Sequence, residues 1–251
     1  MKSKRFFSSV IGAGLILAMA ACGVATPASG ATPRSGSVPS GSGSGACTNP
    51  WEPVKVGATW NYNVTGITTA TDVRTIETVA VDGFTDKNVF SNGITLPGQW
   101  KCSNGALTAM DPFGTVPAGS SSTNSLHTDS VDGTGLSAST KPGDSFLLTY
   151  HMLGTLKENG TTAPLTEVVS KTCNAVNMLS VTVAAGTFDA LHLTCKISLT
   201  ISATINGTAG QPIVSNSTVQ RWFAKGVGLV KSSDTSSAGV RTTELMSYSI
   251  P

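Results

Sequence analysis

Fifteen consecutive residues at positions 191–205 (LHLTCKISLTISATI) alternate between apolar or small side chains and polar ones. Successive side chains of a β-strand point to opposite faces, so this pattern predicts a strand with one buried and one solvated face. A typical strand has about 5–6 residues, and this run is much longer. We therefore expect either one long strand that bends around a curved sheet or two strands that meet at a β-bulge.

The rest of the chain predicts further strands. Short turn signals, mostly Asn-Gly, Asp-Gly and Pro-Gly, separate apolar or alternating segments along the chain. These segments are 59–65, 73–81, 88–91, 107–110, 145–153, 165–171, 178–183, 213–223, 228–233 and 240–250. No window shows helical periodicity with a cap at both ends, although residues 98–109 could form one helical turn. The predicted fold class is all-β, a single curved antiparallel sheet of about ten strands that forms a half-barrel or an open barrel.

Residues 111–142 differ from these segments because they are polar and rich in glycine and serine. Such a composition is typical of a long exposed loop, and it also fits a pair of weak strands at the edge of a sheet. Both alternatives place the stretch at the surface, where it could contact another molecule.

The N-terminus predicts export. Three basic residues stand among the first five, and an uncharged apolar run follows at 6–21. At sixteen residues this run is shorter than the ~20 residues of a membrane-spanning helix, so we expect a signal peptide at 1–21. Residues 17–22 (LAMAAC) resemble a bacterial lipobox, with Met19 where the family usually has leucine. The resemblance implies that Cys22 is lipidated and becomes the mature N-terminus; the alternative is ordinary cleavage with an unmodified Cys22.

The segment after Cys22 predicts a disordered linker. Of the 24 residues at 23–46, 21 are Gly, Ser, Pro, Ala or Thr, so no apolar face can be drawn through them. With the lipidated cysteine, residues 22–46 would hold a β-rich envelope domain at 47–251 on a flexible tether. We expect the acyl chains to anchor the protein to a cell membrane or outer membrane, facing the extracytoplasmic side.

The charge distribution excludes a nucleic-acid partner. Only 12% of residues are charged, against about 25% in an average globular protein. The formal net charge is +2, but four of the sixteen basic residues lie in the signal peptide and linker, which leaves twelve basic and fourteen acidic residues at 47–251. No cluster of Lys and Arg follows the first residues, and nucleic-acid binding requires one.

Four cysteines remain in the domain once Cys22 is assigned to lipid: Cys47, Cys102, Cys173 and Cys195. An oxidising compartment favours disulfides, and four cysteines allow three connectivities. The hairpin expected near 184–187 folds the chain back and brings Cys173 near the level of Cys195. That register favours Cys173–Cys195 and hence Cys47–Cys102, with free buried thiols as the alternative.

We find no motif that indicates catalysis or metal binding. No G-x-S-x-G elbow accompanies His127, His151 or His192, and there is no C-x-x-C pair. Residues 129–135 (DSVDGTG) lack the ligand spacing of a calcium loop. We therefore expect a protein that is not an enzyme and that has no cofactor and no metal site.

Four phrases of the domain follow one pattern: PVKVGATWNY at 53–62, VAAGTFDA at 183–190, WFAKGVGLVK at 222–231 and ELMSY at 244–248. Together they resemble a broad group of bacterial exported and lipid-anchored proteins. The resemblance implies a curved antiparallel half-barrel, similar to envelope lipoprotein carriers, and the group mostly lacks an assigned activity. The sequence departs from the pattern at Ala184, where proline is usual, at Phe223, where tyrosine is usual, and in its four domain cysteines.

The resemblance carries over no site residue, because none of the shared residues is a known catalytic residue. The expected function is a non-catalytic binding module for an apolar ligand or lipid, accepted on the concave side or open end of the sheet. The alternative is a structural or interaction protein that docks an envelope partner through a sheet edge or residues 111–142. The ligand-binding residues stay unassigned at this point.

Overall fold

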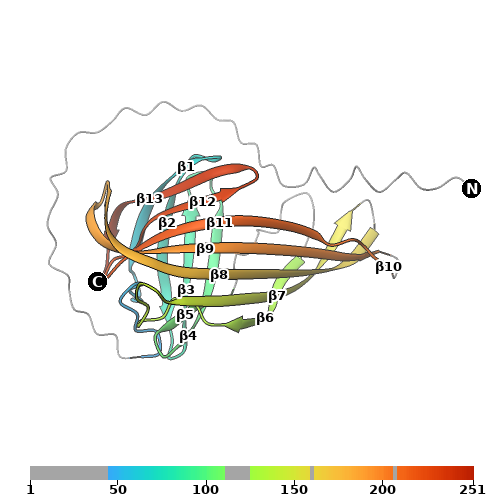
Figure 1. Ribbon diagram of the computed structural model, residues 1–251, viewed down its shortest axis with the longest axis horizontal. Coiled ribbons are helices and arrows are strands. Elements are labelled where there is room, and N and C mark those ends of the chain that lie inside the picture. The colour runs from blue at the N-terminus through green and yellow to red at the C-terminus, as the bar shows by residue number, and fades with distance from the viewer. Residues whose placement is uncertain (1–44, 111–124, 159–160, 206–207) are drawn as a thin grey trace, which may run out of the picture. The chain divides into compact units, whose positions relative to one another are not determined.

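The computed structural model describes residues 45–110, 125–158, 161–205 and 208–251. In these ranges the chain forms one antiparallel sheet of 13 strands and no helix (Figure 1). The strands are β1 (Thr59–Gly66), β2 (Ala70–Val79), β3 (Gly83–Phe90), β4 (Thr95–Ser103), β5 (Ala106–Ala109), β6 (Ser125–Gly133), β7 (Ser145–Glu158), β8 (Thr161–Val183), β9 (Gly186–Ile205), β10 (Thr208–Ala209), β11 (Ile213–Ala224), β12 (Gly228–Ser236) and β13 (Gly239–Ser249).

The strand order is β5-β4-β3-β2-β1-β13-β12-β11-β9-β8-β7-β6, with the short β10 paired to β9. An all-β fold with a single antiparallel sheet is therefore confirmed. The predicted signal peptide at 1–21, Cys22 and most of the predicted linker at 22–46 lie outside the described residues.

The expected count of about ten strands was too low, and the possible helical turn at 98–109 is wrong. That segment holds β4 and β5, because β4 pairs along its length with β3. Pro97 and Gly98 are poor strand formers, which hides the strand in the sequence. Gly98 is nevertheless required, since a Cβ there would collide with the Asp86 carboxylate on the neighbouring strand.

Two other segments also differ from the expectation. Residues 165–171 and 178–183 belong to one strand, the 23-residue β8, in which a β-bulge lies between Ala175 and Asn177. In the polar stretch 111–142, residues 125–133 form β6 at the edge of the sheet, whereas residues 111–124 lie outside the described residues.

The alternation at residues 191–205 is present in β9, which is one continuous strand of 20 residues. Leu191, Leu193 and Cys195 are buried, and the polar residues between them point to the other side. We call the side that carries these buried residues the inner face and the opposite side the outer face. The alternative of one long strand is confirmed, and a β-bulge at Val176 bends its neighbour β8.

Three apolar clusters fill parts of the inner face and its surroundings. The first cluster includes Trp60, Ile76, Phe84, Val230 and Leu245. The second cluster includes Trp51, Leu136, Cys173, Leu193 and Val219. The third cluster, on β7 and β8, consists of Leu148, Tyr150, Met152 and Val169, with Leu126, Val131, Ile197 and Leu199 packed against it.

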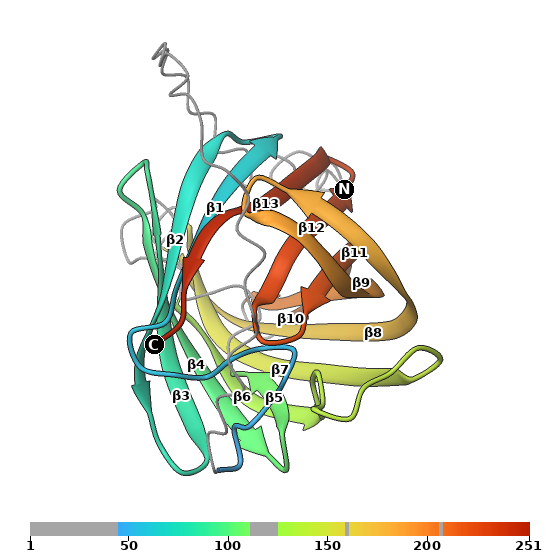
Figure 2. The same ribbon diagram turned by 90° about the vertical axis from the view of Figure 1, so that its left-hand side faces the viewer.

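The sheet curls so that its edge strands β5 and β6 approach each other without closing (Figure 2). Contact is made by the residues that follow β6. The Leu107 N–H donates to the Leu136 carbonyl at 3.1 Å, and the Ala138 N–H donates to the Gly105 carbonyl at 2.9 Å. Gly135 permits this approach, because a Cβ there would overlap the carbonyl oxygen of Leu107.

Candidate functional site

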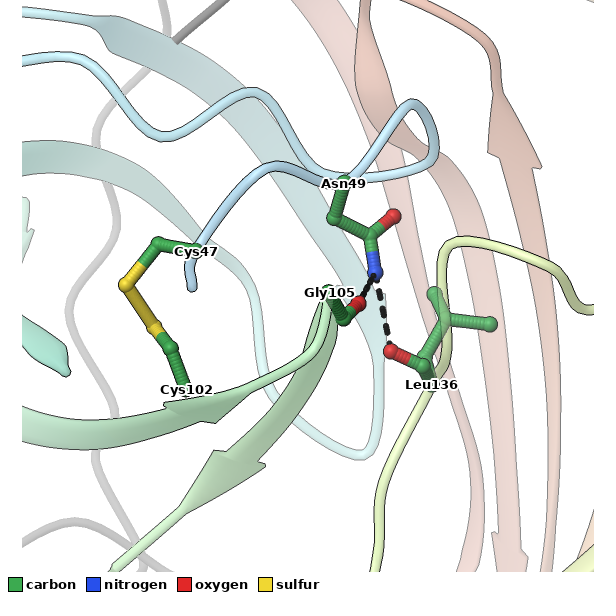
Figure 3. Close-up of a disulfide and its surroundings, with 5 residues drawn as sticks. All are labelled: Cys47, Asn49, Cys102, Gly105 and Leu136. Carbon is green, nitrogen blue, oxygen red and sulfur yellow. Dashed lines mark hydrogen bonds between the residues drawn. A yellow bond between two sulfur atoms is a disulfide. The ribbon is translucent and has the colours of Figure 1, made fainter. Parts of the chain in front are cut away.

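Residues 45–58, which we call the N-terminal strap, cross from one part of the curled sheet to another. Cys47 forms a disulfide with Cys102 of β4. The Asn49 side-chain amide donates to the carbonyls of Gly105 and Leu136 at 2.8 and 2.9 Å, so it holds the two sheet edges together (Figure 3). The Pro50 carbonyl accepts from the Gly226 N–H at 2.7 Å. The strap thus links both edges to the turn between β11 and β12.

The second disulfide joins Cys173 of β8 to Cys195 of β9, which face each other in the ladder. Both disulfides have the connectivity that the hairpin register favours. Each of the four cysteines is buried. The cysteines therefore stabilise the fold, one pair within the sheet and one pair at the strap.

A buried charged cluster lies where the strap meets β2 and β3. The Arg74 guanidinium forms ion pairs with Glu52 of the strap and with Asp86 of β3, the latter at 2.6 Å between Nε and Oδ2. Its carbon Cζ stands over the rings of Trp60 and Trp100, 5.3 and 5.4 Å from their centroids. A guanidinium between two aromatic faces and two carboxylates is held by cation–π attraction and charge-assisted hydrogen bonds together.

The electrostatics of this cluster follow from its burial. Burial by itself lowers the pKa of Arg74, but the carboxylates of Glu52 and Asp86 outweigh it and raise that pKa above its ordinary value. Burial raises the pKa of Asp72 to about 6, against an ordinary 3.8, although Arg74 opposes the shift. Burial also raises the pKa of the Tyr62 phenol, whose hydroxyl donates to the Leu229 carbonyl at 3.1 Å. The ion pairs of Arg74 with Glu52 and Asp86 therefore hold the strap against β2 and β3.

A second group of charges lies on the inner face between the second and third clusters. Lys171 of β8 is flanked in the ladder by Leu148 of β7 and Ile197 of β9. Arg221 of β11 points to the same face, between Leu193 of β9 and Ser232 of β12. All the apolar flanking residues here belong to, or pack against, the second or third cluster.

Asp234, the carboxylate whose charge acts on Lys171, is already engaged. Asp234 of β12 accepts from Nε and Nη2 of Arg241 at 3.0 and 2.5 Å. Lys171 and Arg221 take part in none of the ion pairs found among the described residues. The Arg221 Nε is buried without a hydrogen-bond partner. Burial, reinforced by the charge of Arg221 and opposed by Asp234, lowers the pKa of Lys171 to about 7.

The outer face carries a hollow of about 480 Å³ over β8, β9, β11 and β12. Hydroxyl groups dominate its lining, together with one amide and one ammonium; the outer-face residues are Ser170, Thr172, Lys196, Ser198, Asn216, Thr218 and Thr235. This is the solvated face that the alternation at 191–205 predicts. Ile197 is the one large apolar side chain in its lining, and the other lining residues are polar.

The three histidines lie on strands and form no common site. His127 is on the edge strand β6. His151 Nε2 lies 3.2 Å from Asp132 Oδ2, and both side chains are largely exposed. His192 stacks on Trp222 with ring centroids 4.8 Å apart, and its Nε2 bonds to Gln220 Oε1 at 3.1 Å. His192 is therefore more enclosed than the solvated position expected for it.

Within the described ranges, no three of His, Cys, Asp and Glu are grouped so as to hold a metal ion. The same ranges contain no helix with the length and apolarity that a membrane crossing requires.

No family model and no curated protein matches the chain. Two solved structures are similar to it. A candidate lipoprotein from Parabacteroides distasonis is 13% identical with a TM-score of 0.53, and the match covers 80% of this chain and 99% of that one. A candidate exported protein with a YmcC-like fold from Bacteroides fragilis is 15% identical with a TM-score of 0.47, covering 81% and 100% of the two chains. The similarity to the P. distasonis structure supports the assignment of the fold and nothing beyond it.

Proposed function

We propose that this chain is a lipid-anchored extracytoplasmic binding module that holds an apolar or amphiphilic ligand against the inner face of its sheet. The observation that carries the proposal is the half-buried group of Lys171, Arg221 and Asp234 beside the apolar third cluster. Packed interiors exclude charged side chains that are not fully paired, so this part of the inner face is suited to water or a ligand. Apolar walls with a few polar groups are the usual lining of small-molecule sites.

Two further observations support the location. The first 22 residues have the order of a lipoprotein signal, with basic residues, an apolar run and small residues before Cys22. The similar structure from P. distasonis is described as a candidate lipoprotein. The strap at 45–58 begins where the expected linker at 22–46 ends, so an anchor at Cys22 would pull on the part of the fold that is held by the Cys47–Cys102 disulfide.

Cys22→Ala is expected to release the protein from membranes. The substitution removes the thiol that would carry the acyl chains, and a protein without them has no anchor of that kind. Metabolic labelling with palmitate followed by membrane fractionation measures the effect, with Cys47→Ala as the matched control for a cysteine that is disulfide-bonded. Continued palmitate labelling of Cys22→Ala would refute lipidation at this residue.

Binding of an apolar ligand is tested with hexadecanol, an uncharged sixteen-carbon chain. Native mass spectrometry of the full-length protein, released from a volatile detergent, is expected to show a one-to-one hexadecanol adduct. The chain would lie against the third cluster, where the partly buried Ile197 and Leu199 supply apolar contact. The absence of any adduct with hexadecanol and with palmitate would contradict the proposed function.

Docking of an envelope partner is the second candidate. The observation that favours it is that β6 ends the strand order of the sheet, since edge strands can accept another strand. However, β6 carries a bulge between Thr128 and Ser130 together with Asp129 and Asp132. Bulges and charges on edge strands discourage strand addition. We therefore prefer ligand binding on the inner face to partner docking through β6.

A further inference from the structure

Lys171 occupies a position where an apolar residue would be expected. It lies on the inner face of β8, two residues from Val169 and two from Cys173, both of which are fully buried. Its ladder neighbours Leu148 and Ile197 are apolar. An ammonium in such surroundings loses hydration, and a buried cation is stable only with compensating anions or hydrogen bonds.

Arg221 adds a second cation on the same face. Ile197 pairs with Ser217 of β11, and Arg221 lies four residues further along that strand. The two cations are close enough for the charge of Arg221 to disfavour protonation of Lys171. The buried Nε of Arg221 has no hydrogen-bond partner among the described residues, so one donor of this guanidinium is unsatisfied.

The charges that face this pair do not neutralise it. Asp234 of β12 is bound by Arg241 of β13 through two guanidinium nitrogens. Glu167, two inner-face positions from Lys171 on β8, is engaged in a polar or electrostatic interaction, and it is not among the charges that act on Lys171. On the adjoining strand β7, the inner-face neighbour opposite Lys171 is Leu148. The inner face therefore has an excess of positive charge at the border of an apolar cluster.

We infer that Lys171 and Arg221 bind the anionic head of a long-chain carboxylate whose hydrocarbon chain lies on the third cluster. This inference rests on the proposed function and names its ligand class. A carboxylate would accept hydrogen bonds from the Lys171 ammonium and from the unsatisfied Arg221 Nε. Its negative charge would supply the counter-charge that these two cations lack. Beyond Lys171, Ile197 and Leu199 are only partly buried and offer apolar contact to the chain at the edge of the third cluster.

The test compares palmitate with hexadecanol on the full-length protein by native mass spectrometry in a volatile detergent. The wild type is expected to bind palmitate at least about tenfold more tightly than hexadecanol. Lys171→Met should remove this preference, because methionine keeps the length of the side chain and loses its charge. Lys196→Met is the matched control, since Lys196 is exposed on the outer face next to Ile197.

Each outcome has a distinct meaning. Equal binding of palmitate and hexadecanol by the wild type would overturn the carboxylate site and leave the proposed function intact. Loss of both ligands in Lys196→Met would also overturn it, because the outer face would then contribute. No binding of either ligand to any variant would overturn both proposals. Thermal melting of Lys171→Met, expected at or above the wild-type temperature, shows that the variant is folded.

Discussion

Arg74→Met is expected to lower the free energy of unfolding by about 3–5 kcal/mol. The substitution leaves the carboxylates of Glu52 and Asp86 buried without their common cation. It also removes the guanidinium that stands between Trp60 and Trp100. Because Glu52 belongs to the N-terminal strap, the loss should loosen the strap as well as the sheet. Urea unfolding followed by tryptophan fluorescence measures the change.

The matched control is Lys87→Met. Lys87 pairs with Glu77 at 2.6 Å, but the two side chains are 42% and 40% exposed. Exposed ion pairs contribute about 0–1 kcal/mol, so this variant should unfold close to the wild type. If Arg74→Met and Lys87→Met unfolded at the same urea concentration, the buried cluster would not stabilise the fold as described.

The paired substitution Cys47→Ala and Cys102→Ala is expected to cost roughly 4 kcal/mol of stability. The two cysteines are 55 residues apart in sequence, and a crosslink across that distance removes much conformational freedom from the unfolded chain. The pair Cys173→Ala and Cys195→Ala bridges only 22 residues and should cost less, roughly 3 kcal/mol. Chemical denaturation of the two double variants measures the difference.

The Cys47–Cys102 bond has a second expected effect. Without it the strap is held by Asn49, Pro50 and the Glu52–Arg74 pair, so its first residues should become accessible to proteases. The Cys173–Cys195 variant should leave the strap protected, since that disulfide lies within the sheet. Equal protease sensitivity of the two variants would contradict the role given to the strap.

Local sequence patterns were sufficient to predict the parts of the fold in which apolar and polar residues alternate. The inner residues of β9 and the buried positions Trp60, Tyr62 and Val64 of β1 lie where period two places them. The hairpin register that favours Cys173–Cys195 is also a local property of two strands joined by a short turn. Gly186 in that turn has a φ of 142°, a conformation that other residues rarely adopt.

The charged groups could not be predicted in the same way. In β2, Asp72 and Arg74 share a face with Ile76, and two charged residues out of three indicate a solvated face. The burial of Arg74 depends on Trp60, Trp100 and the strap, which lie far from it in sequence. Lys171 did leave a signal, since it interrupts the apolar positions of β8 between Val169 and Cys173.

The central claim is that the inner face holds an amphiphilic ligand at Lys171 and Arg221. A crystal structure of the full-length protein with bound palmitate tests it most directly. We expect the carboxylate at hydrogen-bond distance, about 3 Å, from Lys171 Nζ, with the chain along Ile197 and Leu199. Palmitate bound in the outer-face hollow near Lys196, or an inner face packed only with protein side chains, would contradict the claim.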